Sequence, residues 1–206
     1  MKNRMAKICT LIFTLLLVMI VTGCGDVFVL QSNQRPNDDI SKAIYKAVGR
    51  RKVYYHAKEY SNSGEIAWYE YTVQDYKDEN VLANMVEAVN AVLEEKEMTD
   101  KICLAIWERI PGGYETVASI SNYCEIEDGY ETYESLQNLY IRGSEDFNRS
   151  SLYNNPSTYF NLPDIKSLVV RKNIAKIAEE EEIDWYEIWP DLEHYDIYDE
   201  YERYED

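Results

Sequence analysis

Histidine, the side chain that most often moves protons near neutral pH, is almost missing from this sequence of 206 residues. Only His56 and His194 are present, so histidine-dependent catalysis has little to work with. The sequence also lacks a nucleophile elbow, a phosphate-binding loop, a dinucleotide-binding glycine motif and a His-Glu-x-x-His zinc motif. An Asp-x-Asp-x-Asp-Gly calcium loop is absent too. We therefore expect a protein that is not an enzyme, with no catalytic residue, no metal and no cofactor.

Basic residues are also few, because 21 Lys and Arg stand against 38 Asp and Glu, for a net charge of −17. Binding to nucleic acid needs a basic stripe, so we exclude nucleic acid as a partner. The acidic excess is concentrated near the C-terminal end, where residues 179–206 hold 14 acids and one base. Such a segment suits a basic partner, cations or plain solvation.

No apolar run in the sequence is long enough to cross a bilayer as a helix. The N-terminal run covers residues 8–21, about 14 residues, whereas a span needs about 20. Lys2, Arg4 and Lys7 precede this run and no acid does. A positive start, a short apolar centre and small residues at the end predict a cleavable export signal.

The end of this segment, Val21-Thr22-Gly23-Cys24, resembles the lipobox of bacterial lipoproteins. The resemblance implies a signal peptide over residues 1–23, cleavage after Gly23, and a diacylglyceryl group on Cys24. It also implies that acyl chains such as palmitate hold the mature protein on the extracytoplasmic face of the cell membrane. Two or more chains anchor durably, since each buried methylene contributes about 0.8 kcal/mol. The alternative interpretation is an ordinary signal peptide that ends near a cysteine.

Two cysteines remain in the mature chain, Cys103 and Cys124, in a compartment that permits disulfides. They flank a predicted hairpin, and its register decides their chemistry. If they lie directly opposite each other, a disulfide can form. A loop shorter by two residues makes them diagonal neighbours about 7–8 Å apart between Cα atoms, too far to bridge comfortably. A disulfide and two packed thiols are both open.

The pattern of apolar residues over 40–128 predicts an α+β region with the order strand, strand, helix, strand, strand. Its helix, expected over 80–97, has apolar residues at three- and four-residue steps. An antiparallel sheet with this one packed helix would bury the apolar stripe. The strands are expected over 53–60, 65–73, 101–109 and 116–123.

The N-terminal end of the mature chain is expected to lie outside this sheet. Residues 24–39 are interpreted as a lipidated tether, because they start apolar and then turn polar. A short helix is predicted over residues 40–48, with Asp39 as its N-cap.

Three segments of the last third share one apolar spacing, namely Leu136-x-x-Leu139-x-Ile141, Ile165-x-x-Leu168-x-Val170 and Leu192-x-x-Tyr195-x-Ile197. They resemble the strand portion of leucine-rich repeats, and Asn173 stands where such a repeat places its ladder asparagine. The resemblance implies a degenerate repeat-like β/α region over residues 129–200. It also implies an intervening helix over 174–182 and strands that add in parallel, extending the sheet. Residues 201–206 are expected to be an acidic, disordered end.

Aromatic residues are abundant, with 19 Tyr and four Trp. Trp185, Tyr186 and Trp189, beside the acidic run, are the candidates for recognition, because exposed aromatic rings make platforms for sugars and proteins. We interpret the chain as a non-catalytic, membrane-anchored binding protein for a protein or a glycan. Two alternatives stay open: a cell-envelope hydrolase that acts on glycan or peptide, and an inhibitor or immunity-like protein that binds a basic partner through its acidic tail.

Overall fold

The computed structural model describes residues 28–32, 38–48, 53–59, 66–74, 79–110, 113–126, 129–144 and 152–199. The predictions of a signal peptide, of cleavage after Gly23, of lipid on Cys24 and of an acidic end over 201–206 lie outside these residues. Within the described ranges, no helix has the length and apolar character that a membrane span requires.

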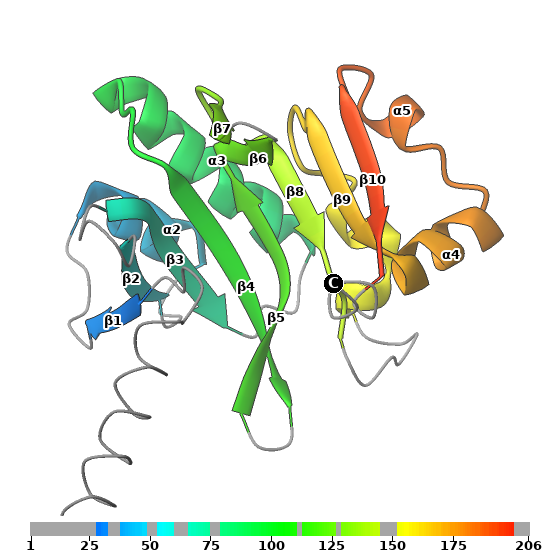
Figure 1. Ribbon diagram of the computed structural model, residues 1–206, viewed down its shortest axis with the longest axis horizontal. Helices are drawn as coiled ribbons and strands as arrows, with labels where there is room; N and C mark the ends of the chain where they lie inside the picture. Colours follow the sequence, from blue (N-terminus) through cyan, green and yellow to red (C-terminus); the bar gives the residue numbers. More distant parts are fainter. Residues whose placement is uncertain are drawn as a thin grey trace, which may run out of the picture.

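Eight strands form one mixed sheet, in the order β1-β2-β3-β4-β5-β8-β9-β10 (Figure 1). Two further strands, β6 (Tyr123–Ile126) and β7 (Gly129–Thr132), form a separate hairpin. The strands of the main sheet are β1 (Phe28–Ser32), β2 (Val53–Glu59), β3 (Ile66–Gln74), β4 (Ile102–Ile110), β5 (Gly113–Ser121), β8 (Asn138–Ile141), β9 (Ser167–Arg171) and β10 (His194–Tyr198).

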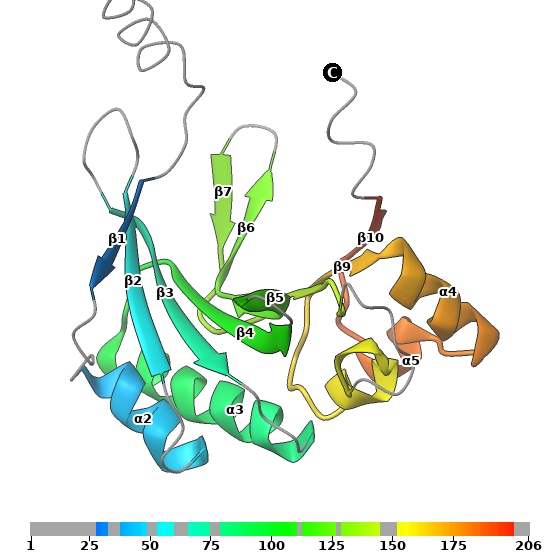
Figure 2. The same cartoon turned by 90° about the horizontal axis from the view of Figure 1, so that it is seen from below.

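Helices cover one face of this sheet, and the β6–β7 hairpin projects from the other (Figure 2). The α-helices are α2 (Asp39–Val48), α3 (Glu79–Lys96), α4 (Lys172–Glu180) and α5 (Trp185–Ile188). Two 3-10 helices, η1 (Leu152–Asn154) and η2 (Pro156–Tyr159), precede β9. The apolar stripe predicted for α3 is confirmed as part of the core, which buries Leu82, Met85, Val86, Val89 and Leu93.

The sheet is mixed, so the predicted antiparallel sheet with a single packed helix is wrong in two respects. The β2–β3 and β4–β5 hairpins are antiparallel as predicted, but β3 and β4 are parallel neighbours. The reason is the 18 residues of α3, which run back along the sheet and return the chain to the end where β3 began. In addition, α2 packs against α3 as a second helix.

The N-cap of α2 is one residue earlier than predicted. Asp38 accepts the backbone N–H of Ser41 at 2.7 Å through its carboxylate. Asp39 is instead the first helical residue, and it forms ion pairs with Lys42 at 3.1 Å and with Lys96 at 3.7 Å. The hydrogen bond and the charge of Lys42 lower the pKa of the Asp39 carboxyl.

The predicted tether is interrupted by an edge strand. Residues 28–32 pair antiparallel with β2, from Phe28 opposite Glu59 to Ser32 opposite Tyr55. This pairing satisfies the backbone donors and acceptors on the outer side of β2. If residues 28–32 were only a tether, those groups would have no strand partner. Only three residues, 25–27, therefore separate Cys24 from the sheet.

The three repeat-like segments give neighbouring parallel strands, as the spacing predicted. Leu168 of β9 lies between Leu139 of β8 and Tyr195 of β10 in register, and β8 joins β5 to extend the sheet. No repeating unit is evident, because η1 and η2 connect β8 to β9 whereas α4 and α5 connect β9 to β10. Asn173 is exposed in the first turn of α4 and cannot act as a buried ladder asparagine.

Candidate functional site: an acidic groove beside strand β10

A groove of about 810 Å³ opens between α4, α5 and β10. These three elements lie together at one end of the sheet (Figure 1). Its lining includes six residues with mainly apolar side chains: Ala175, Ala178, Ile183, Trp185, Tyr195 and Ile197. The groove therefore offers a concave, partly apolar surface, which makes it the candidate ligand site.

The turn between α4 and α5 shapes one wall of the groove. Glu182 has a left-handed backbone with φ of 55°, and the N–H of Ile183 donates to the carbonyl of Ala178 at 2.9 Å. This is a Schellman ending, in which the residue after the left-handed position folds back onto the helix. Asp184 then accepts the N–H of Tyr186 at 2.9 Å and caps α5.

Two of the three aromatic residues predicted for recognition belong to the core. Trp185 and Trp189 are each 4% exposed, and their rings stack at a centroid distance of 5.5 Å and an interplanar angle of 5°. The indole N–H of Trp189 donates to the carbonyl of Leu162 at 3.0 Å. The four-residue spacing turns both rings to the buried side of α5. Trp185 is nevertheless one of the residues that line the groove, whereas Trp189 is not.

Tyr186 is the exposed member of the predicted trio. Its side chain is 52% exposed, and Ile197 of β10, which also lines the groove, is 48% exposed. Among the described residues, the third large hydrophobic side chain in this class is Tyr114 of β5, at 43%. Sequence reasoning missed Ile197, because its position in the alternation of β10 matches that of Val170 in β9, which is fully buried.

Tyr195 of β10 also lines the groove and is half-buried. Burial raises the pKa of its phenol. The group is therefore a neutral phenol at physiological pH. A neutral hydroxyl can donate or accept a hydrogen bond with a ligand in the groove.

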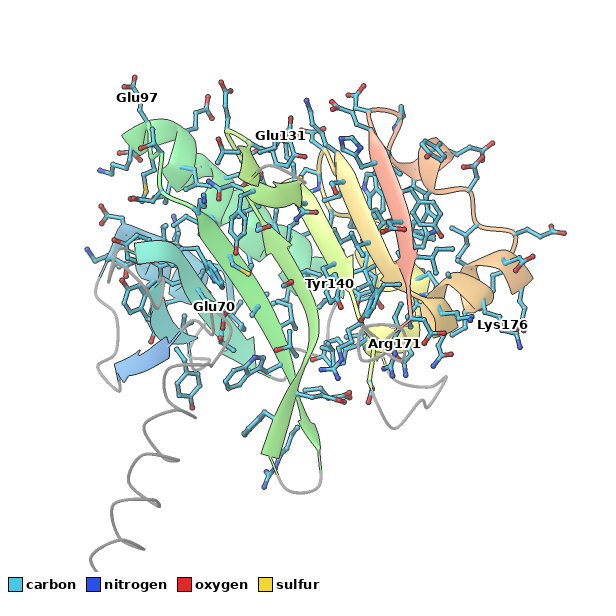
Figure 3. All side chains as sticks on the ribbon, viewed as in Figure 1. Glu70, Glu97, Glu131, Tyr140, Arg171 and Lys176 are labelled. Atoms are coloured by element: carbon cyan, nitrogen blue, oxygen red, sulfur yellow. The ribbon has the colours of Figure 1, made fainter. Side chains whose placement is uncertain are left out.

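Charged residues line the outer parts of the groove, and the acids outnumber the bases. The two bases are Lys172 and Lys176, both on α4, and Figure 3 labels Lys176. Lys172 pairs with Asp199 at 3.0 Å, and Lys176 lies 4.0 Å from the Glu180 carboxylate. The acids of the lining are Glu179, Glu182, Asp184 and Asp199. Electrostatically, the groove suits a ligand that carries positive charge.

Strand β10 is the last strand of the sheet. The backbone N–H of His194 donates to the carbonyl of Lys166 at 3.0 Å, on the side of β9. Because backbone N–H groups along a strand alternate between its two sides, the N–H of Ile197, three residues later, faces the open edge of the sheet. The Asp196 carboxylate accepts this N–H at 2.8 Å. The edge donor beside the groove is thus satisfied within the strand itself.

Cys103 and Cys124 are free thiols in the structure, so the candidate disulfide is not formed. Cys103 lies opposite Ser121 rather than Cys124, because β5 ends at Ser121 and Cys124 belongs to the separate β6–β7 hairpin. Cys103 is buried, whereas Cys124 is half-buried and accepts a hydrogen bond from the Tyr133 hydroxyl at 3.6 Å. Neither cysteine lines the groove.

The described residues place no three His, Cys, Asp or Glu side chains together as a metal site. A pair of carboxylates does face across neighbouring strands, Glu108 of β4 and Glu115 of β5. Glu115 is 7% exposed and accepts a hydrogen bond from the Ser144 hydroxyl at 3.1 Å. This pair lies at the far end of β4 and β5 and does not line the groove.

No protein-family model and no curated protein matches the sequence. Among solved structures, the chain is similar to the crystal structure of a sex pheromone precursor from Lactobacillus salivarius subsp. salivarius UCC118, with 14% sequence identity and a TM-score of 0.24. The similarity covers 57% of this chain and 60% of that one. A likeness of this extent carries no argument about activity or partners.

Proposed function

We propose that this protein is a lipid-anchored lipoprotein of the extracytoplasmic face of the cell membrane, and that it acts there as a non-catalytic binding protein. Its ligand is a segment of a protein partner that carries both apolar and basic side chains. The observation that carries this proposal is the presence of Tyr186 and Ile197, 52% and 48% exposed, in the lining of one groove.

The physical chemistry of the groove supports such a ligand. Burying the exposed parts of Tyr186 and Ile197 against an apolar partner removes apolar surface from water, which is the main favourable contribution to binding. The acids around the groove attract a basic segment and disfavour an acidic one. An amphipathic peptide meets both requirements, with its apolar side chains inside and its basic side chains at the rim.

The test uses the full-length lipidated protein in nanodiscs of zwitterionic lipid, with a peptide of alternating lysine and leucine as the probe. Tyr186→Ala should weaken binding about tenfold or more, since truncating an interface anchor costs over 1 kcal/mol. Tyr114→Ala is the matched control, because its ring is similarly exposed (43%) on β5, away from the groove. A peptide with glutamate in place of lysine should not bind. Equal losses in the two variants would refute the groove as the binding site.

An inhibitor or immunity-like role would share this charge preference, since it also needs a basic partner. The dependence on salt separates the two roles. Masking by the acidic segment alone weakens steeply as salt is raised, because it relies on exposed charges. Binding that rests on Tyr186 and Ile197 persists at high salt, and Ile197→Asp abolishes it.

A further inference from the structure

The short distance between the anchor and the sheet limits how the domain can sit on a membrane. Strand β1 begins at Phe28, four residues after Cys24. Four residues of extended chain reach at most about 14 Å. A tether that ran to residue 39 would reach about 50 Å and would let the domain turn freely. With β1 in the sheet, the β1 edge must stay close to the lipid headgroups.

The groove is at the opposite edge of the same sheet. Between β1 and β10 there are seven steps from strand to strand, and neighbouring strands lie about 4.8 Å apart, which gives a separation of roughly 34 Å. Figures 1 and 2 both show β1 and α2 at one end of the molecule and α4, α5 and β10 at the other. The molecule thus has an anchored end and a groove end.

Acidic charge is concentrated at the groove end. Residues 179–199 hold ten acids and no Lys or Arg, a net charge of −10, whereas the described residues of β1, α2 and β2 with Asp38 hold three bases and three acids. Lys42 and Lys46 of α2 are exposed at the anchored end. An anionic bilayer attracts these two lysines and repels the acidic groove end, within a screening distance of about 8 Å at physiological salt.

From the tether length and the acidity of the groove end we propose an orientation: the β1–α2 end of the domain rests on the anionic membrane surface, and the groove beside β10 faces away from it, about 30 Å higher. The orientation rests on the proposed lipid anchor at Cys24. The tether keeps β1 low, and the repulsion of the acidic end excludes the arrangement in which the sheet lies flat. A partner then reaches the groove from the aqueous side.

Energy transfer from the protein to labelled lipid headgroups tests this orientation. The full-length lipidated protein carries a donor dye at Lys46→Cys or at Glu187→Cys, each in a Cys103→Ala/Cys124→Ser background whose folding is checked by circular dichroism. The vesicles contain phosphatidylglycerol and phosphatidylcholine. We expect clearly higher transfer from position 46 in α2 than from position 187 in α5. Inserting about twelve Gly and Ser residues after Asp26, which adds about 40 Å of reach, should remove most of this difference.

Each result bears on the orientation in a defined way. Equal transfer from the two positions, or higher transfer from position 187, overturns it. A difference that survives the insertion overturns the role of the short tether. Mass spectrometry of the purified protein reports separately on the anchor, and a Cys24 without lipid overturns the anchor and the orientation together. Loss of peptide binding to the groove would instead contradict the proposed ligand and leave the orientation intact.

Discussion

Truncating Trp189 is expected to unfold the groove end of the protein rather than to remove a binding contact. The ring is 4% exposed, stacks on Trp185 and donates to the carbonyl of Leu162. Trp189→Ala should therefore cost about 3–5 kcal/mol, as large-to-small core substitutions do. Trp189→Phe keeps a six-membered aromatic ring but loses the indole donor and the volume of the five-membered ring, which should cost about 1–3 kcal/mol. Tyr186→Ala, on an exposed ring, should change stability by no more than about 0.5 kcal/mol.

Thermal unfolding followed by far-UV circular dichroism gives the measurement. A domain of this size loses about 2–4 °C in Tm per kcal/mol, so Trp189→Ala should melt about 6–20 °C below the parent protein, with Trp189→Phe between them. The refuting result is a Trp189→Ala protein that melts with the parent protein and fails to bind the peptide. That outcome would make Trp189 an exposed recognition residue.

Three further predictions concern the backbone, the titration of tyrosine and the thiols. Glu182→Gly should raise stability by up to about 1 kcal/mol in urea unfolding, because glycine adopts the left-handed position of residue 182 without a Cβ clash; a loss of stability would contradict the Schellman ending. Burial raises the pKa of Tyr55 from 10.0 to about 12, so the folded state holds the phenol proton more tightly than the unfolded state does. The contribution of this proton to folding stability is full below pH 10 and is lost as the pH rises through 12. Tyr55→Phe should therefore reduce the loss of stability in unfolding measured from pH 9 to 12. Ellman's reagent should react slowly with Cys124 in the native lipidated protein and with Cys103 only after denaturation, and a protein with no reactive thiol after denaturation would show that the two are bridged.

Local patterns in the sequence predicted much of the fold. The three- and four-residue spacing of apolar residues located α3, and Gly- and Ser-rich turns located the β2–β3 and β4–β5 hairpins. The shared spacing of the last three segments predicted that β8, β9 and β10 lie side by side in parallel. These signals succeed because each reflects one face of an element that must be buried.

The rest of the fold depended on information that local patterns do not contain. The parallel pairing of β3 with β4 is decided by the connection through α3, because the sequences of the two strands alone are compatible with either parallel or antiparallel pairing. The apolar start of β1 is too short to distinguish a strand from a tether. The cap at Asp38 stands beside an equally suitable Asp39.

The candidate site was predicted only in part, for a physical reason that concerns burial. Tyr186 was correctly placed beside the acidic run, but the spacing of Trp185 and Trp189, which puts both on one face of a helix, already indicated a buried pair. Ile197 could not be recognised, because its exposure follows from its place on the last strand of the sheet. The groove itself requires three elements that the sequence does not bring together.

The carboxylate of Asp196 has a consequence for the crowded surface on which we place this protein. Anchored proteins are confined to the plane of the membrane, so their open strand edges meet more often than they would in solution. An unprotected edge promotes aggregation by strand pairing. By accepting the N–H of Ile197 at 2.8 Å, Asp196 occupies one of the donors that a second chain would use, and its charge repels the same strand of a neighbour. The edge that carries the groove can thus remain open to a ligand while copies of the protein stay separate.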